Sequence, residues 1–376
     1  MNEFGQLMAA LRNTPYHQWM KAEGIPIVEG HGVEDVRDIE LVRWPRTGGK
    51  GSFIHLYGME GSTGMYVGEI PSGGALAPEK HIYEEVIVIL EGNGATEVRQ
   101  GQHGKKQTFE WSKGSLFALP LNCWHRLVNG GREPVKFLAV TTAPIIMDLY
   151  QNLDFIFNSD FEFRERFTEE EDYFSGVGKR YKTGRINIWE TNFISDVSSA
   201  AVEAMEEKGV GAKITQFEIA GNSLVGHMSQ WPAGLYHKAH YHGPGSILFG
   251  LQSRGYVLLW SKDLGTRPFE NKQGDRVVEM QWKDGSVYCP PGGWFHQHFN
   301  IGSGVARQLA IRFGGRIHPT GFATAAKRHD EGVLVSVKNG GTLIEYEDED
   351  PTIRSRFESA LVGTGIRCEM PKFVAA

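Results

Sequence analysis

Short apolar runs, each about as long as a β-strand, fill two stretches of this chain and are separated by Gly, Asn and Pro. The first stretch, residues 51–143, contains SFIHLYG, GMYVGEI, EEVIVILEG, ATEVRQ, SLFALP and PVKFLAVT. The second, residues 212–313, contains KITQFEI, SLVGHMSQW, SILFGLQSRGYVLLW, RVVEMQW, SVYCPP and ARQLAIRF. Short strands at regular spacing with turn residues between them predict a β-sandwich or β-barrel in each stretch.

Helical patterns lie outside these two stretches. Apolar residues at helical spacing between Phe4 and Leu11 predict a short N-terminal helix. Between residues 145 and 210 the strand signal fades, and LYQNLDFIF, FRERFTEEEDYF and SDVSSAAVEAMEEKG read as short helices, the last with Ser195 or Asp196 as N-cap. A further helix is expected in DEDPTIRSRFESAL, with Pro351 at its first position.

Composition narrows the class of protein. The chain has 376 residues, with 39 Lys and Arg against 45 Asp and Glu, so its net charge is −6. This charge disfavours nucleic acid or an anionic membrane as the main partner, since both usually require a basic surface. No apolar run approaches the roughly 20 residues that span a bilayer, and the start lacks the features of a signal peptide. Three scattered cysteines, Cys123, Cys289 and Cys368, predict no disulfide framework and a cytoplasmic location.

The two β-rich stretches are related by an internal duplication. Residues 114–129, GSLFALPLNCWHRLVN, align without a gap to residues 285–300, GSVYCPPGGWFHQHFN. Both segments share Gly-Ser at the start, and then Pro, an aromatic residue, His and Asn at the same spacing. The chain therefore contains two copies of one β-domain.

Histidines cluster in the second copy, in HKAHYHGPG and GGWFHQHFN. His240 and His242 are two residues apart, so on a strand they point to the same face, and His296 lies on a strand that could pair beside them. Three neutral imidazoles with open positions form a ligand set for a transition metal. His298 shares the face of His296 and is a candidate fourth ligand or proton carrier. The simpler alternative is that these histidines are only solvated or hydrogen-bonded near turns.

The first copy carries a different set of possible ligands at the corresponding positions. The residues at these positions are Glu79, His81, Glu85 and His125. Together they could hold iron, manganese, nickel or zinc. In the alternative interpretation the glutamates form ion pairs with Lys80 or Arg126.

The first copy resembles the two motifs of the cupin family. The first motif, G-x5-H-x-H-x3-E-x6-G, is matched with Glu in place of its first His, by Gly73, Glu79, His81, Glu85 and Gly92. The second, G-x5-P-x-G-x2-H-x3-N, is matched with Asn122 in place of Gly, by Gly114, Pro120, His125 and Asn129.

The second copy matches the same two motifs with one loss. Its first motif retains Gly234, His240 and His242 but has Ser246 at the glutamate position. Its second motif is complete, with Gly285, Pro291, Gly293, His296 and Asn300.

The chain therefore resembles a bicupin, and the resemblance implies a mainly β fold of two tandem jelly-roll β-barrels. We expect short helices at the N-terminus, in the connector and at the C-terminus. The expected division is an N-terminal segment (1–50), an N-terminal barrel (51–145), a helical connector (146–211), a C-terminal barrel (212–315) and a C-terminal extension (316–376).

Among cupins, a three-His site resembles that of Fe(II) dioxygenases that cleave aromatic rings, whose bicupin members act on gentisate, 1-hydroxy-2-naphthoate and salicylates such as 5-nitrosalicylate. The resemblance implies Fe(II), with Mn, Ni or Zn as alternatives. It also implies a small hydroxylated aromatic acid and O2 as substrates, and a homo-oligomer, with a tetramer favoured. Gentisate-type enzymes usually keep the metal triad in the N-terminal cupin, whereas the complete triad here is C-terminal.

A substrate of this class needs a cation for its carboxylate and an apolar wall for its ring. An arginine matches a carboxylate with two parallel hydrogen bonds, and the candidate arginines are Arg254 and Arg312. Gln230, Tyr236 and Trp294 flank the histidines and are further candidates for substrate binding, although core packing is an equally good explanation of each. His298 or His227 is the candidate for proton transfer.

Three other functions fit the same sequence. The first is a manganese or nickel lyase, decarboxylase or isomerase in which the N-terminal Glu and His residues act. The second is a non-catalytic bicupin that binds a small ligand, which the retained histidines disfavour. The third is a metal sensor, although no basic recognition helix is apparent.

Overall fold

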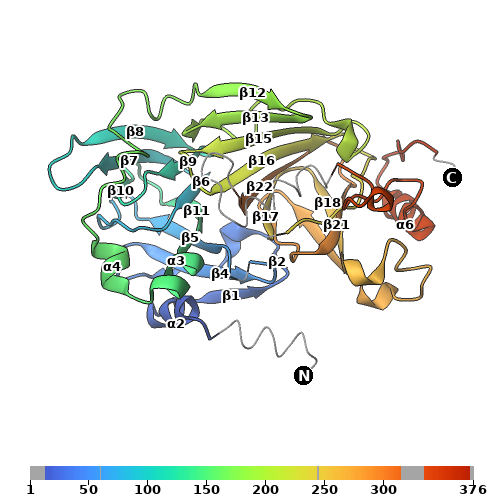
Figure 1. Ribbon diagram of the computed structural model, residues 1–376, viewed down its shortest axis with the longest axis horizontal. Coiled ribbons are helices and arrows are strands. Elements are labelled where there is room, and N and C mark those ends of the chain that lie inside the picture. The colour runs from blue at the N-terminus through green and yellow to red at the C-terminus, as the bar shows by residue number, and fades with distance from the viewer. Residues whose placement is uncertain (1–12, 60, 244, 315–333, 373–376) are drawn as a thin grey trace.

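The computed structural model describes residues 13–59, 61–243, 245–314 and 334–372. Two β-rich halves lie side by side, with the helices at the periphery (Figure 1). Within the described residues, no helix is long and apolar enough to cross a membrane. The helix expected between Phe4 and Leu11 falls outside the described residues.

The N-terminal half is a jelly-roll barrel made of a large and a small sheet. Neighbours in the large sheet are, in order, β1 (Ile27–Gly30), β4 (Lys50–Leu56), β5 (Gly64–Ile70), β11 (Val135–Thr141), β6 (Glu85–Glu91), β9 (Leu116–Leu119) and β14 (Phe193–Ile194), and β3 (Val42–Arg43) also pairs with β4. The small sheet has the order β10 (Trp124–Val128), β7 (Asn93–Arg99) and β8 (Gln107–Ser112).

The C-terminal half repeats this arrangement. Its large sheet has the order β12 (Lys179–Thr183), β13 (Ile186–Thr191), β15 (Lys213–Ile219), β16 (Leu224–Trp231), β22 (Ala306–Phe313), β17 (Ser246–Gln252), β20 (Val287–Tyr288) and β2 (Gly32–Val33). Its small sheet has the order β19 (Val278–Lys283), β18 (Arg254–Ser261) and β21 (Trp294–Asn300). The expected mainly β fold of two cupin-like barrels is therefore confirmed. The strand orders coincide from β1 and β13 onward, and among the described strands only the edge strands β3 and β12 lack a counterpart.

The two halves exchange edge strands. β2, from the N-terminal segment, pairs with β20 of the C-terminal sheet, and β14, from the connector, pairs with β9 of the N-terminal sheet. Each barrel therefore closes its large sheet with residues from outside its own repeat. This arrangement also protects two sheet edges from pairing with other chains.

The prediction of a helical connector is wrong for most of its length. The connector contains β12, β13 and β14, and its helices are α3 (Ala143–Tyr150) and α4 (Leu153–Asn158). The segment FRERFTEEEDYF forms turns, and SDVSSAAVEAMEEKG holds only a 3-10 turn at Glu206–Lys208. Helical propensity is a weak bias, and pairing with the existing sheets outweighs it here.

Two helices begin as their sequences dictate. In α2 (Pro15–Ala22), Thr14 accepts a hydrogen bond from the backbone N–H of His17. In α6 (Pro351–Leu361), Asp350 accepts one from the N–H of Thr352, and Pro351 occupies the first helical position as predicted.

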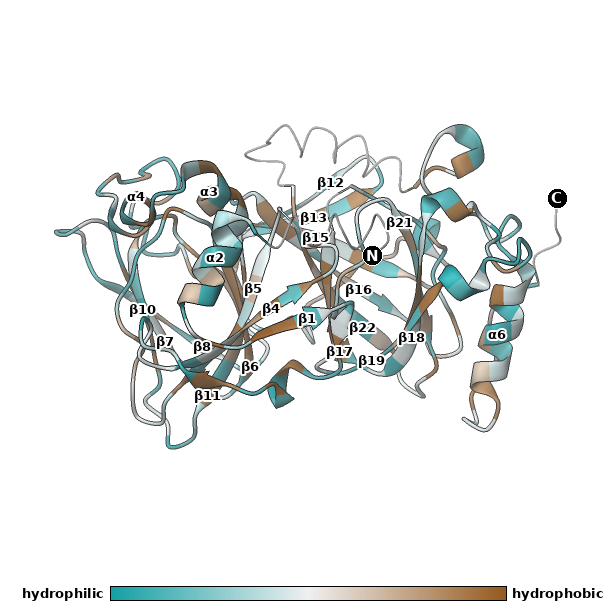
Figure 2. Ribbon diagram, turned by 90° about the horizontal axis from the view of Figure 1, so that it is seen from below, coloured by the Kyte–Doolittle hydropathy of each residue, from teal (hydrophilic) through white to brown (hydrophobic). Residues whose placement is uncertain are grey.

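The largest apolar core lies between the two halves. In β6, Val86, Val88 and Leu90 point into this shared core, whereas Ile87 and Ile89 point into the N-terminal barrel. From the C-terminal half the shared core receives Met228, Ile247, Leu309 and Ile311, among others. Hydrophobic stretches accordingly run along strands in the middle of the molecule (Figure 2). Both faces of each large sheet are buried, which explains the nearly continuous apolar runs in the sequence.

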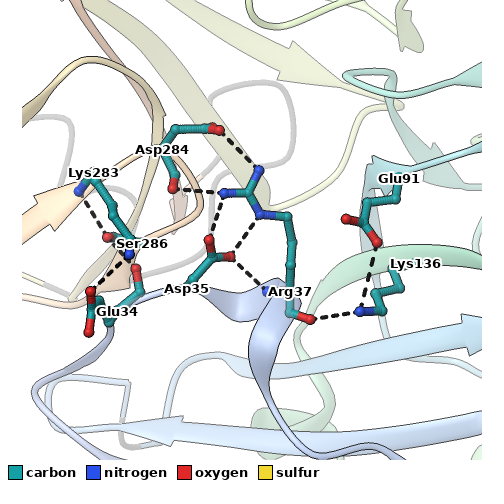
Figure 3. Close-up of polar contacts among 8 residues, drawn as sticks. All are labelled: Glu34, Asp35, Arg37, Glu91, Lys136, Lys283, Asp284 and Ser286. Atoms are coloured by element: carbon teal, nitrogen blue, oxygen red, sulfur yellow. Dashed lines mark hydrogen bonds and ion pairs between the residues drawn. The ribbon is translucent and has the colours of Figure 1, made fainter.

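Polar contacts close the seam between the halves (Figure 3). Arg37 donates to Asp35 with a 2.6 Å nitrogen–oxygen distance and to Asp284 at 3.0 Å. Lys136 of β11 donates to the Arg37 carbonyl at 2.7 Å. Residues from the N-terminal segment thus contact both barrels.

Candidate metal centres

The histidines of the C-terminal barrel come from one strand and one loop. His296 lies on β21, but His240 and His242 lie in the extended loop between β16 and β17 rather than on a strand as predicted. The backbones of His240 and His296 exchange two hydrogen bonds, of 3.2 and 2.9 Å. This bridge holds the loop against β21 and brings the three rings together.

The three imidazoles converge as metal ligands do. One ring nitrogen from each of His240, His242 and His296 lies within 4.8 Å of the others. Nδ1 of His240 faces the Lys238 carbonyl at 3.2 Å, and Nδ1 of His296 faces the Trp294 carbonyl at 3.1 Å. Each carbonyl accepts the Nδ1 proton, which leaves Nε2 with a free electron pair toward the common point.

Burial keeps the imidazoles of His240 and His296 neutral. It lowers the pKa of His296 to about 3, with the charge of Lys208 acting in the same direction. Burial, Lys208 and the neighbouring histidines lower the pKa of His240 well below its usual value. Neutral imidazole is the form that binds a metal, so the donor set fits a divalent transition metal.

The N-terminal barrel brings together a second set, made of His81, Glu85 and His125, whose ligand atoms also lie within 4.8 Å of one another. Nδ1 of His81 lies 2.8 Å from the Tyr83 carbonyl, and Nδ1 of His125 lies 3.0 Å from the Cys123 carbonyl. Nε2 of His81 therefore presents its electron pair to the Glu85 carboxylate, 3.3 Å away. Two acceptors at this distance need a cation or a proton between them, so this set also fits a metal.

Polar neighbours of Glu85 favour its ionised form. Burial alone would raise the pKa of the Glu85 carboxyl, but the neighbouring His81, His125 and Tyr66 together lower it. The Tyr66 hydroxyl donates to the same carboxylate at 2.6 Å.

Glu79 takes no part in this set. Its backbone exchanges hydrogen bonds with His125, as that of His240 does with His296. Its carboxylate, however, forms an ion pair with Arg46, which also contacts Glu23 at 3.0 Å. The proposed four-ligand set is therefore reduced to three, because a partner distant in the sequence takes up the Glu79 carboxylate.

A cavity of about 60 Å³ lies beside the three histidines of the C-terminal barrel. Two cationic side chains, Lys208 and Arg312, line it, and both are buried. Among the described residues that line this cavity, none is acidic. The cavity is therefore suited to an anion.

His298 lines the same cavity, and its ring orientation is fixed by two neighbours. Gln308 donates to the Tyr288 oxygen at 2.8 Å, and the Tyr288 hydroxyl lies 2.9 Å from Nδ1 of His298. With Tyr288 donating to Nδ1, the ring proton of His298 is on Nε2. His298 is thus placed as a hydrogen-bond donor beside the metal position, separate from the three converging imidazoles.

The predicted substrate residues divide into two groups. Arg312 lines the cavity, as does His227, which was the alternative candidate for proton transfer. Tyr236 instead is fully buried against Phe299 and donates to Glu349 at 2.5 Å, so it belongs to the core.

The remaining three candidates also have other places in the fold. Gln230 accepts a hydrogen bond from Arg307 at 3.0 Å. Arg254 is exposed at the start of β18. The Trp294 carbonyl accepts the hydrogen bond from Nδ1 of His296, so this residue positions a ligand. Proximity in sequence to a histidine does not place a side chain in the cavity, because alternate residues of a strand point to opposite faces.

Three residues that line the cavity were not predicted from the sequence as site residues, namely Lys208, Ser246 and Gln308. Lys208 lies in the segment SDVSSAAVEAMEEKG, which was predicted to be a short helix. The signal for Ser246 was available, because it occupies the glutamate position of the cupin motif. Gln308 was detectable as a polar residue in the apolar run ARQLAIRF.

Residues 66–141 match the family profile described as "Cupin domain". This segment contains His81, Glu85 and His125, and its strand order recurs in the C-terminal barrel.

Solved structures similar to the chain include variants of oxalate decarboxylase from Bacillus subtilis. A tryptophan-to-tyrosine variant is 12% identical, with a TM-score of 0.48, over 76% of this chain and 78% of that one. A glutamate-to-alanine variant is 12% identical, with a TM-score of 0.49, over 78% of this chain and 79% of that one. No curated protein matches the chain.

Proposed function

We propose that the protein is an Fe(II)-dependent dioxygenase that cleaves the ring of a hydroxylated aromatic acid with O2, in the degradation of aromatic compounds. The observation that carries this proposal is the composition of the C-terminal site. Among the described residues this site has three imidazoles and no carboxylate ligand, beside a cavity lined by Lys208 and Arg312.

The charge of this site explains its suitability for such a substrate. Fe(II) held by His240, His242 and His296 would supply a template for an anionic chelate and for O2. A ligand set without carboxylate leaves the full positive charge of the ion to attract the substrate. Lys208 and Arg312 would add to this attraction, and His298, whose Nδ1 faces the Tyr288 hydroxyl, would offer its Nε2 proton to an acceptor on the substrate.

The substrates that we propose are gentisate, salicylate and 5-substituted salicylates, including 5-nitrosalicylate. Each carries a carboxylate next to or near a ring hydroxyl. The two candidate metal centres differ, because only the set in the C-terminal barrel lacks a carboxylate among the described residues. This difference supports a dioxygenase that acts on such acids over a lyase that relies on a glutamate ligand.

One observation favours a second candidate function. The cavity of about 60 Å³ is smaller than the roughly 150 Å³ cavity that holds benzene in an engineered protein core. This size favours a small acid, and with it a non-oxidative lyase, decarboxylase or isomerase.

Oxygen uptake separates the two candidates. We expect protein loaded anaerobically with Fe(II) to consume O2 when given gentisate, salicylate or a 5-substituted salicylate, and His240→Ala to abolish this uptake. Bound iron with no uptake on any of these acids would contradict the dioxygenase and support the lyase. Release of CO2 from small dicarboxylates without O2 would then identify the reaction.

We also propose a homo-oligomer, with a tetramer favoured, as in related bicupins. Light scattering coupled to size-exclusion chromatography measures this directly, and a mass equal to one chain would contradict it.

A further inference from the structure

The two barrels differ at one pair of neighbouring positions beside the metal centre. In the N-terminal barrel, Glu85 of β6 pairs in register with Thr141 of β11. At the equivalent place in the C-terminal barrel, Ser246 of β17 pairs with Arg312 of β22. Register partners on one sheet face have their Cβ atoms about 4.5–5.5 Å apart, so each pair acts as a unit.

This difference exchanges a carboxylate for a cation. Glu85 belongs to the converging metal-binding set of its barrel, with its ligand oxygen within 4.8 Å of the two imidazole nitrogens. Ser246 lacks a carboxylate and is shorter by two heavy atoms, while Arg312 replaces the neutral Thr141. The C-terminal barrel has therefore lost a negative charge and gained both space and a positive charge in the same place.

Ser246 also has an unmet hydrogen-bonding capacity. Its side chain lines the cavity, the residue is 1% exposed, and its Oγ has no hydrogen-bond partner. Oε1 of Gln308, on the strand that carries Arg312, is likewise buried in the cavity wall without a partner. Buried polar atoms are rarely left unpaired, because each costs about 1–3 kcal/mol. A ligand with an acceptor for the Ser246 hydroxyl and a donor, such as a hydroxyl group, for Oε1 of Gln308 would satisfy both.

We infer that the carboxylate of the substrate occupies the place of the missing glutamate, where the Ser246 hydroxyl donates to it and the Arg312 guanidinium balances its charge. This inference rests on the proposed function only in taking the C-terminal cavity as the metal-dependent site. It explains why the protein lacks its own carboxylate there, because a protein carboxylate would compete with the substrate for both the position and the charge.

The test restores the glutamate and measures binding without turnover. Protein carrying Co(II) in place of iron is titrated with salicylate and, separately, with acetate, and the visible absorption of the cobalt reports binding. Metal affinity is measured by competition with a chelator. For Ser246→Glu we expect salicylate binding to weaken at least tenfold and Co(II) affinity to increase at least tenfold.

Matched variants separate charge from size. Ser246→Gln has nearly the same shape as Ser246→Glu, so it should weaken salicylate binding but leave Co(II) affinity unchanged. Arg312→Gln should weaken salicylate binding at least tenfold, again without loss of Co(II), and Arg312→Lys should recover part of the loss. An unchanged thermal midpoint of each variant shows that the fold is intact.

Two outcomes would overturn the inference. One is unchanged salicylate affinity in either Ser246→Glu or Arg312→Gln. The other is no binding of either carboxylate to the Co(II) form of the unmodified protein. If salicylate binds as expected but the Fe(II) protein consumes no O2, the proposed function fails while the carboxylate position stands. If O2 is consumed but Ser246→Glu binds salicylate normally, only the inference fails.

Discussion

The interiors of the two barrels differ in chemistry although their strand orders are the same. Across the large sheet, one row of side chains in the N-terminal barrel reads Phe53, Tyr66, Ala139 and Ile87. The equivalent row in the C-terminal barrel reads Gln216, His227, Ala310 and Leu248. The next row changes from Gly68, Phe137 and Ile89 to Ser229, Gln308 and Gly250.

At these positions the interior of the N-terminal barrel is packed, whereas that of the C-terminal barrel lines the cavity. The ring of Phe137 lies directly over Gly68, where an added Cβ would be 2.3 Å from the ring. The C-terminal barrel has the smaller Gln308 opposite Ser229, and both line the cavity. Backbone hydrogen bonds build the same frame in both cases, and the choice of side chains decides whether its interior stabilises the fold or binds a ligand.

The largest expected effect separates the two metal centres. His240→Ala should reduce O2 uptake at least about a hundredfold. Removing even a group that only hydrogen-bonds to a metal ligand lowers metal affinity or activity about ten- to hundredfold, and His240 is a candidate ligand itself. His81→Ala should leave most of the uptake, because its barrel is packed with aromatic side chains. Uptake by both Fe(II)-loaded variants is the measurement, and loss in His81→Ala alone would assign the reaction to the N-terminal barrel.

The second prediction concerns stability and uses the equivalent positions Phe137 and Gln308. Phe137→Ala should lower the free energy of unfolding by about 3–5 kcal/mol, because it leaves a cavity in a packed core. Gln308→Leu should lower it by only about 1 kcal/mol, the cost of one hydrogen bond to Tyr288. Urea unfolding of the metal-free proteins measures both. Equal losses would show that the two interiors contribute alike.

The third prediction concerns Glu349, a buried acid beside the C-terminal barrel. Burial raises the pKa of Glu349 to about 7, despite hydrogen bonds from Tyr236 and Gln297. The folded protein therefore holds this proton in a pH range where the unfolded chain, with an ordinary glutamate, has lost it. The contribution to stability is present below the unfolded pKa and is lost as pH rises from about 4.5 to 7.

Glu349→Gln should remove this pH dependence, which amounts to about 3 kcal/mol at most. We expect the variant to gain stability relative to the unmodified protein between pH 5 and pH 8. A difference between the two proteins that stays constant over this range would contradict the raised pKa.

The smallest effect is expected at the seam. Arg37→Ala removes the contacts with Asp35 and Asp284, of which the latter is half exposed. Partly exposed ion pairs contribute about 0–1 kcal/mol, so thermal unfolding should shift only slightly and both barrels should still unfold together. Separate unfolding transitions in this variant would show that the ion pairs of Arg37, rather than the shared apolar core, join the halves.

Much of this architecture was predictable from local patterns. The apolar runs matched β5, β15 and β22 residue for residue, since strands buried on both faces leave an unmistakable signature. The duplicated motif predicted two equivalent sites, and His240, His242 and His296 converge in one of them. The connector was mispredicted, because β13 and β14 are short strands stabilised by partners far away in the sequence.

By itself, then, the sequence determined the two barrels, their repeat and the residue types able to bind a metal, because these depend on periodicity and spacing within a few residues. Only the tertiary structure decided that Glu79 pairs with Arg46, that Tyr236 is buried in the core, and that Lys208 reaches the cavity. It also decided that Ser246 lies beside Arg312. These outcomes depend on which distant strands pair and in what register, and that is set by burial of the whole chain rather than by any one segment of it.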